Sequence, residues 1–264
     1  MTTIQALILA IVEGLTEFLP VSSTAHMKFT NPIIGVANTP FSDMFEVVIQ
    51  LAAILAVVVV YYKKFFDFSR INFYIKLIIA VIPALVFGGL FKKRIDAMMD
   101  NLYAISCIMI VGGIIFLFID RLFRYPKIED ESKVSNLAAF KIGCFQVLSI
   151  MFPGLSRSAS TIIGGMAQGL SRKAAAEFSF FLAVPTMLAA SAKSFLDVYK
   201  EHPDVLTKDN FTILGISSVV TFIVAIIVIR YFIGFLKTHG FRVWGYYRIF
   251  IGTVMLILLW RGIV

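Results

Sequence analysis

The chain carries the stretch EGLTEFLPVSSTAH at residues 13–26 and a related stretch, FPGLSRSAST, at residues 152–161. Both stretches place ionisable and hydroxyl side chains, together with a proline, inside otherwise apolar sequence. An ionisable side chain costs free energy when a membrane surrounds it, so such residues are rarely found there without a partner or a function. The two stretches therefore predict a functional site as well as a break in the fold.

The composition around these stretches predicts an all-α polytopic membrane protein. Hydrophobic residues make up 59% of the 264 residues and the mean hydropathy is +0.89, which is more than a water-soluble core requires. Six windows approach or reach the roughly 20 apolar residues that cross a bilayer as a helix, and they are too long for the strands of a membrane barrel. These windows are residues 44–62, 73–91, 102–119, 177–196, 211–229 and 246–259.

The two polar stretches are expected to form re-entrant helical hairpins rather than further spanning helices. Residues 3–18 and 137–151 are too short to cross as regular helices, and Pro20 and Pro153 would break them. Irregular backbone at membrane depth is tolerated only where protein buries it or where it lines a wet cavity. We place the hairpins at about residues 3–30 and 137–172, and we call residues 20–24 the first elbow and residues 153–158 the second elbow. No cleavable signal peptide is expected, because the apolar start already contains Glu13 and Glu17.

A weak internal repeat predicts two halves of inverted topology within a single membrane domain, residues 1–264. A helix that opens with a glutamate follows each elbow, at Glu46 and at Glu177. The first repeat would be residues 1–135 and the second residues 136–264, each with one hairpin followed by three helices. Three crossings turn the second half upside down, so the two hairpins would enter from opposite faces and meet near the middle.

The distribution of charge between the loops orients this arrangement. Loops that are rich in Lys and Arg face the cytoplasm, so the net charge of +8 reports membrane orientation and no nucleic-acid partner is expected. The side with more basic residues should be cytoplasmic, so the first hairpin, and with it the site, is expected to open to the exterior. Lys92, Lys93 and Arg94 lie on the side with fewer basic residues and run against this orientation. Thirteen basic residues fall on one side (Lys63, Lys64, Arg70, Lys76, Arg121, Arg124, Lys127, Lys133, Arg172, Lys173, Arg230, Lys237 and Arg242) and seven on the other (Lys28, Lys92, Lys93, Arg94, Lys200, Lys208 and Arg261).

Two acidic residues in the first stretch suggest a cation site. Glu13 and Glu17 are four residues apart and therefore share one face of a helix. Two close carboxylates in a medium of low dielectric constant cannot both stay ionised without a cation or a shared proton. A divalent cation, magnesium or calcium, suits such oxygen ligands and can also bridge phosphate oxygens. The alternative is that both glutamates only form hydrogen bonds with neighbouring helices.

The hydroxyl groups of both elbows suggest phosphate binding. A new helix is expected to start in each elbow, and the unpaired backbone N–H groups of a helix start attract phosphate. Arg157 could grip phosphate with two hydrogen bonds. The alternative is that the hydroxyl groups only cap broken helices. The candidates are Ser22, Ser23 and Thr24 in the first elbow, and Ser156, Ser158, Ser160 and Thr161 in and after the second.

His26 is the only histidine near these residues. Glu17, Ser23 and His26 could converge as base, nucleophile and acid. A purely structural hydrogen-bonding role for His26 is the alternative.

The sequence resembles the undecaprenyl-diphosphate phosphatases, a membrane family linked to bacitracin resistance. The resemblance covers essentially the whole chain and rests on four motifs together: residues 13–26, FEVVIQL at 45–51, PGLSRS at 153–158 and EFSFFLAVP at 177–185. The family often has glycine where Ala25 stands, and Gly-Ala-Thr at 159–161 where this chain has Ala-Ser-Thr. Neither departure removes a reactive group.

The resemblance implies hydrolysis of undecaprenyl diphosphate to the monophosphate carrier used in peptidoglycan synthesis, and with it bacitracin resistance. It also implies a divalent cation and a multi-pass protein of the bacterial cytoplasmic membrane with its site open to the periplasmic side; a homodimer is left open. Glu13 and Glu17 would match the family's acidic pair, and Arg157 its essential arginine. Ser23 and His26 would match its proposed nucleophile or acid.

Two questions stay open at this stage. Ser23 could attack the terminal phosphorus while Glu17 or His26 takes its proton, or His26 could itself be the nucleophile. A transporter or flippase for a polyprenyl phosphate is the alternative function, because broken helices and midplane charges also mark carriers.

Overall fold

The computed structural model describes residues 1–91, 95 and 98–263, and this part of the chain is helical apart from loops and one isolated bridge between Ile128 and Leu170. Six of the described helices are long and apolar enough to cross a membrane, which confirms the predicted class. They are α3 (Pro40–Val60), α5 (Ile71–Leu90), α7 (Leu102–Leu122), α10 (Arg172–Glu201), α11 (Lys208–His239) and α12 (Arg242–Trp260). The basic run at residues 92–94, which ran against the predicted orientation, lies outside the described residues.

Two pairs of shorter helices surround the elbows. Helix α1 (Thr3–Thr16) precedes α2 (Ser23–Ile33), and α8 (Asn136–Met151) precedes α9 (Arg157–Ala167). At 1.5 Å per residue, α1 and α8 are roughly 21 and 24 Å long, shorter than the roughly 30 Å hydrocarbon core of a bilayer. Each pair has the helix-break-helix form expected of a hairpin, and its entry from one membrane face remains a prediction.

The remaining short elements lie in connections between these helices. Helix α4 (Tyr62–Phe65) and the 3₁₀ helices η1 (Phe68–Arg70), η2 (Glu131–Lys133) and η3 (Pro203–Val205) are each three or four residues long. Element η2 belongs to the charged connector between the proposed halves. There Glu131 accepts hydrogen bonds from Lys64 and Arg70 at 2.9 and 3.0 Å. Burial raises the pKa of the Glu131 carboxyl, but these two cations outweigh it and hold the pKa below its usual value.

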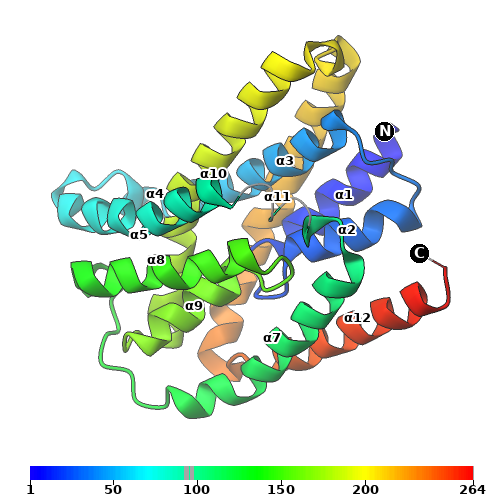
Figure 1. The fold of residues 1–264 in the computed structure, drawn as a ribbon. Helices are drawn as coiled ribbons and strands as arrows, with labels where there is room; N and C mark the ends of the chain where they lie inside the picture. The colour runs from blue at the N-terminus through cyan, green and yellow to red at the C-terminus, as the bar shows by residue number, and fades with distance from the viewer. Residues whose placement is uncertain (92–94, 96–97, 264) are drawn as a thin grey trace.

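The helices of the two proposed halves pack crosswise. Helix α1 lies along α11, and α8 lies along α5, while α7 runs beside α12 and α3 packs against both α10 and α11 (Figure 1). Small residues permit these approaches: a Cβ on Gly14 would lie 2.9 Å from the carbonyl oxygen of Thr221, and one on Gly143 only 2.2 Å from that of Ala80. Each hairpin is therefore supported by a helix from the other half of the chain. The division at residue 135 remains a prediction.

Aromatic side chains contribute to the buried centre of the helical assembly, and both aliphatic and aromatic side chains are exposed on its outside. Phe18, directly after Glu17, is fully buried and its ring contacts that of Phe180 edge to face at 5.1 Å. Ile78 and Ile223 are more than half exposed, as expected for faces that contact lipid. The buried aromatic contact fixes the chain at the point where it enters the first elbow.

Candidate active site

Both elbows contain a serine in the same unusual backbone conformation. Ser22 has φ 72° and Ser156 has φ 78°, and they are the only non-glycine residues of the described chain with positive φ. Each caps the following helix, because its hydroxyl accepts a hydrogen bond from the backbone N–H of Ala25 (3.3 Å) or Ala159 (3.2 Å). Such a conformation costs about 1–3 kcal/mol and is typical of functional sites. The elbows are thus two copies of one strained turn.

The two elbows lie against each other at the centre of the molecule (Figure 1). The hydroxyl of Ser158 donates to the carbonyl oxygen of Leu19 at 3.2 Å and contacts the hydroxyl of Ser156 at 2.9 Å. Residues almost 140 positions apart in the sequence are therefore joined directly. This is the convergence that the two polar stretches predicted.

A carboxylate, a hydroxyl and a guanidinium form the core of the site. Glu17 accepts a hydrogen bond from the hydroxyl of Ser23 at 2.5 Å with one oxygen, and from Nη2 of Arg157 at 2.6 Å with the other. Nη1 of Arg157 donates to a backbone carbonyl of α10 at 3.2 Å. Nε of Arg157 is buried with no hydrogen-bond partner among the described residues. The arrangement gives Ser23 a proton acceptor and leaves Nε of Arg157 as a buried donor without an acceptor.

Glu13 lies one helical turn from this core and is fully buried. Neither of its carboxylate oxygens has a hydrogen-bond partner within the described part of the chain. A buried acceptor without a partner is costly, so this carboxyl must carry a proton or face a cation. Two free oxygens fit a divalent cation, whereas the oxygens of Glu17 are already engaged. No group of three or more His, Cys, Asp or Glu residues in the described chain could hold a metal alone.

His26 is held apart from the Glu17–Ser23 pair. Its Nδ1 lies 2.7 Å from the carbonyl oxygen of Ser22, and its Nε2 lies 2.8 Å from the hydroxyl of Tyr247, whose ring is stacked on the imidazole. A carbonyl can only accept, so Nδ1 carries a proton and Nε2 accepts from Tyr247 when the ring is neutral. No hydrogen bond joins His26 to Ser23 or Glu17 among the described residues. The three residues expected to converge are therefore not all brought together.

The remaining hydroxyl groups near the second elbow are mostly engaged with protein. The hydroxyl of Thr161 donates to the carbonyl oxygen of Arg157 at 2.9 Å and contacts the hydroxyl of Ser179 at 2.6 Å. The hydroxyl of Ser160 is buried without a partner in the described chain. Thr161 thus supports the backbone of Arg157, whereas Thr24 lines a cavity.

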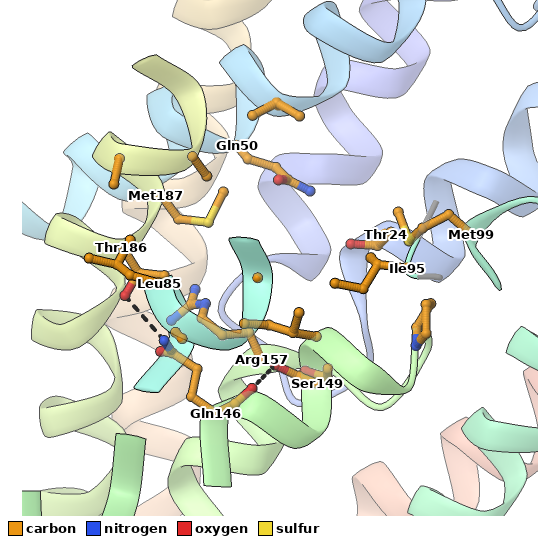
Figure 2. Close-up of a pocket in the computed structure, with 18 of the residues that line it drawn as sticks. Thr24, Gln50, Leu85, Ile95, Met99, Gln146, Ser149, Arg157, Thr186 and Met187 are labelled. Atoms are coloured by element: carbon orange, nitrogen blue, oxygen red, sulfur yellow. Dashed lines mark hydrogen bonds between the residues drawn. The ribbon is translucent and has the colours of Figure 1, made fainter. Parts of the chain in front are cut away.

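A cavity of about 440 Å³ opens beside the core, within the range of small-molecule sites. Figure 2 shows Arg157 at its centre, Thr24 on one side, and Gln146 and Thr186 on the other. Leu85 and Met187 add apolar surface from α5 and α10. Further lining residues include Ser22, Gln50, Ser156 and Lys193. The cavity thus combines a polar end at the two elbows with an apolar end between helices.

The glutamates matched by the internal repeat do not line this cavity. Glu46 accepts from the side-chain amide of Asn31 at 2.6 Å and lies 3.6 Å from the ammonium of Lys28. Glu177 lies 2.7 Å from the ammonium of Lys64. Each of these glutamates is therefore paired with a lysine of another helix, α2 for Glu46 and α4 for Glu177.

Sequence reasoning did not single out three polar residues of this region. Gln146 lines the cavity and its Oε1 is buried without a partner in the described chain. Tyr247 contacts His26, and the next residue, Arg248, is fully buried and reaches both elbows. The signal that revealed the elbows, a costly polar residue in an apolar segment, also applies to Gln146 and Arg248.

Comparisons with known proteins agree with the resemblance seen in the motifs. A family model described as bacitracin resistance protein BacA matches residues 6–254. An undecaprenyl-diphosphatase of Flavobacterium psychrophilum is 51% identical over 98% of this chain and 96% of its own length. Proteins with this name from Porphyromonas gingivalis and Bdellovibrio bacteriovorus are 46% and 41% identical, and the matches cover at least 98% of each chain.

Proposed function

The chain belongs to the bacitracin resistance protein BacA family, and from this premise we propose that Glu17, Ser23 and Arg157 form the site of its phosphatase reaction. The protein is a multi-pass protein of the bacterial inner membrane and hydrolyses undecaprenyl diphosphate to undecaprenyl phosphate and inorganic phosphate. The product is the lipid carrier for peptidoglycan synthesis, and its supply accounts for bacitracin resistance. The observation that carries the site assignment is the single carboxylate of Glu17 that binds both Ser23 and Arg157.

Binding of the diphosphate depends on charge. Phosphoryl transfer requires neutralisation of the phosphate oxygens and an in-line approach of the nucleophile more than covalent assistance. Arg157 has an unused N–H group and lines the cavity, so it can donate to the terminal phosphate while Glu17 fixes its orientation. The N–H groups at the starts of α2 and α9 supply further donors.

The reaction then proceeds in two steps. The hydroxyl oxygen of Ser23 attacks the terminal phosphorus, its proton passes to Glu17, and the bond from that phosphorus to the bridging oxygen breaks, which releases undecaprenyl phosphate. Water next attacks the phosphoserine, and inorganic phosphate leaves as Ser23 regains a proton. The short hydrogen bond from Ser23 to Glu17 supports this assignment of nucleophile and base, whereas Nε2 of His26 is occupied by Tyr247.

A divalent cation, magnesium or calcium, fits beside this core. The free oxygens of Glu13 would hold it, and Glu17 would join them by exchanging one of its present hydrogen bonds, from Ser23 or Arg157, for the cation. When bound, the cation would neutralise charge on the diphosphate. Glu13 would also no longer be a buried acceptor without a partner.

We further propose that the site opens to the periplasmic side. The cavity is lined by Lys193, in the second half of α10, and by Met99, between α5 and α7. These segments belong to the side with fewer basic residues, and loops rich in Lys and Arg face the cytoplasm. A lipid diphosphate could therefore enter from the outer leaflet with its chain along the apolar end of the cavity.

Purified protein and undecaprenyl diphosphate test the site assignment. Glu17→Gln and Arg157→Ala should each lower kcat about 10²-fold or more, because each removes a charge that the reaction uses. Arg172→Ala is a matched control, since Arg172 also forms an ion pair, with Asp120, but lies at the start of α10. The assignment is wrong if the two site variants keep near-normal turnover while folded.

The identity of the nucleophile requires a trapped intermediate. Reaction with a diphosphate labelled in its terminal phosphate, followed by rapid quenching, should leave label on Ser23 in a form that survives acid. Label on His26 would be lost in acid and would make the histidine the nucleophile. Release of phosphate in the same assay also separates hydrolysis from the transport of an unchanged lipid.

A further inference from the structure

Arg248 makes contacts that no catalytic step above uses. It lies on α12, and its side chain is completely buried. Nη1 donates to the carbonyl oxygen of Pro20 at 3.0 Å and Nη2 to that of Gly154 at 2.8 Å. These carbonyls belong to the first and the second elbow, so one planar guanidinium holds both. Nε donates to the carbonyl oxygen of Met109 on α7 at 3.3 Å.

The hydrogen bonds of this guanidinium go to backbone carbonyls alone, and its central carbon lies 5.9 Å from the centre of the Phe116 ring. Among the described residues no carboxylate forms an ion pair with Arg248. A buried charge without an opposite charge is expensive, and a neutral apolar residue would fill the same space more cheaply if packing were its only role. The carbonyls of Pro20 and Gly154 gain partners that their broken helices do not supply. The free-energy cost of burying the charge of Arg248 is therefore incurred where the two elbows meet.

The neighbouring helix is shaped to admit the guanidinium. A Cβ on Gly112 of α7 would lie 2.5 Å from Nη2 of Arg248. At the next position, a Cβ on Gly113 would lie 2.8 Å from the carbonyl oxygen of Gly245 and 3.0 Å from Cβ of Arg248, and its three nearest contacts include no atom of the guanidinium. Adjacent glycines thus serve different contacts: one makes room for the charged end of Arg248, and the other allows α7 and α12 to pack closely.

We propose that Arg248 is a positioning residue that sets the separation of the two elbows, so that Ser23 of one chain segment and Arg157 of the other meet the same phosphate. The inference rests on the proposed function of these elbows. Arg248 touches the backbone only two residues before Ser22 and two residues before Ser156, the strained residues from which α2 and α9 start. A displacement of either carbonyl is therefore passed to the groups that bind and attack phosphate.

A positioning role predicts a specific kinetic defect. An in-line attack is sensitive to misplacement, and an error of about 1 Å can cost about 10²-fold in rate. Arg248→Met keeps an unbranched apolar stem but removes every donor, so kcat should fall about 10²-fold while KM changes far less. Arg248→Lys keeps the charge but not the planar fork that reaches two carbonyls. It should recover only part of kcat.

The adjacent glycines supply the matched pair of variants. Gly112→Ala should push the guanidinium away from Gly154 and lower kcat about tenfold, a smaller effect because the donors remain. Gly113→Ala crowds the backbone of α12 and should lower the melting temperature without a comparable fall in kcat. The measurements are kcat and KM per folded molecule, and the melting temperature, for the full-length protein in lipid nanodiscs.

The outcomes separate positioning from mere structural support. The inference is overturned if Arg248→Met is folded and its kcat is close to that of the original protein, or if Gly112→Ala and Gly113→Ala change kcat equally. If Arg248→Met does not fold, the glycine pair still decides. Should Arg157→Ala lose activity while Arg248→Met keeps it, only this inference fails; should Arg157→Ala stay active, the proposed site fails.

Discussion

Replacement of Ser22 by glycine should stabilise the protein and slow its reaction. Ser22 has φ 72°, where a side chain clashes with the backbone and glycine does not. The strain is about 1–3 kcal/mol. Ser22→Gly removes most of that strain and loses only a few tenths of a kcal/mol as a helix cap. The free energy of unfolding should therefore rise by about 1 kcal/mol.

Ser22→Ala is the informative partner of this variant. It keeps the strain, because alanine also has a Cβ, and loses the hydrogen bond from Ala25 N–H, so stability should fall by about 1 kcal/mol. The two variants should thus change the free energy of unfolding in opposite directions, and they should differ from each other by about 2 kcal/mol. Ser156→Gly and Ser156→Ala repeat the comparison at φ 78° in the second elbow.

Unfolding by sodium dodecyl sulfate in mixed micelles, followed by circular dichroism, measures these differences, and phosphate release gives kcat for the same samples. The looser elbow of Ser22→Gly should lower kcat, since the turn places Ser23 beside Glu17. The reasoning is refuted if Ser22→Gly is no more stable than Ser22→Ala. Increased stability with full activity would show that the strain is not used in catalysis.

Three further predictions concern stability and the cation. Glu131→Gln should cost about 2 kcal/mol, because the carboxylate is buried against Lys64 and Arg70. The pKa of Glu131 is lower in the folded than in the unfolded protein, so its contribution to the free energy of unfolding is complete above the usual carboxyl pKa and is lost as pH falls through the pKa of the folded state. Unfolding measured between about pH 6 and pH 3 should therefore show a smaller loss of stability in Glu131→Gln than in the original protein. Gly143→Ala should destabilise the protein by about 2 kcal/mol or prevent folding, because a Cβ would overlap the carbonyl oxygen of Ala80, and the yield of folded protein checks this. Removal of divalent cations by a chelator should abolish phosphate release, and added magnesium or calcium should restore it; full activity in chelator would contradict the cation proposal.

The fold was largely predictable because its signals are local. Apolar windows located all six long helices, and the breaks fell next to Pro20 and Pro153 as expected. The windows underestimated α10 and α11, which continue to Glu201 and His239. Hydropathy marks only the part of a helix that lipid surrounds, whereas polar ends continue the helix into the interface.

The contact among Glu17, Ser23 and Arg157 was predictable because carboxylate, hydroxyl and guanidinium groups stand beside the helix breaks in both motifs. Their catalytic roles stay predictions. The contacts of Arg248 could not be predicted, since its partners are backbone carbonyls, which every residue possesses and which leave no sequence pattern. The orientation of the His26 ring could not be predicted either, because its partner Tyr247 lies near the other end of the chain.

The crosswise packing of α1 on α11 and of α8 on α5 has a consequence for biogenesis. When the first hairpin leaves the ribosome, the helix that will support it has not yet been synthesised, and about 200 residues must follow before it can dock. Glu13 and Glu17 must wait during that interval without Arg157. The first hairpin therefore stays without its supporting helix until the second half is made, and two halves expressed as separate chains should associate in the membrane, because neither can complete the support of its own hairpin.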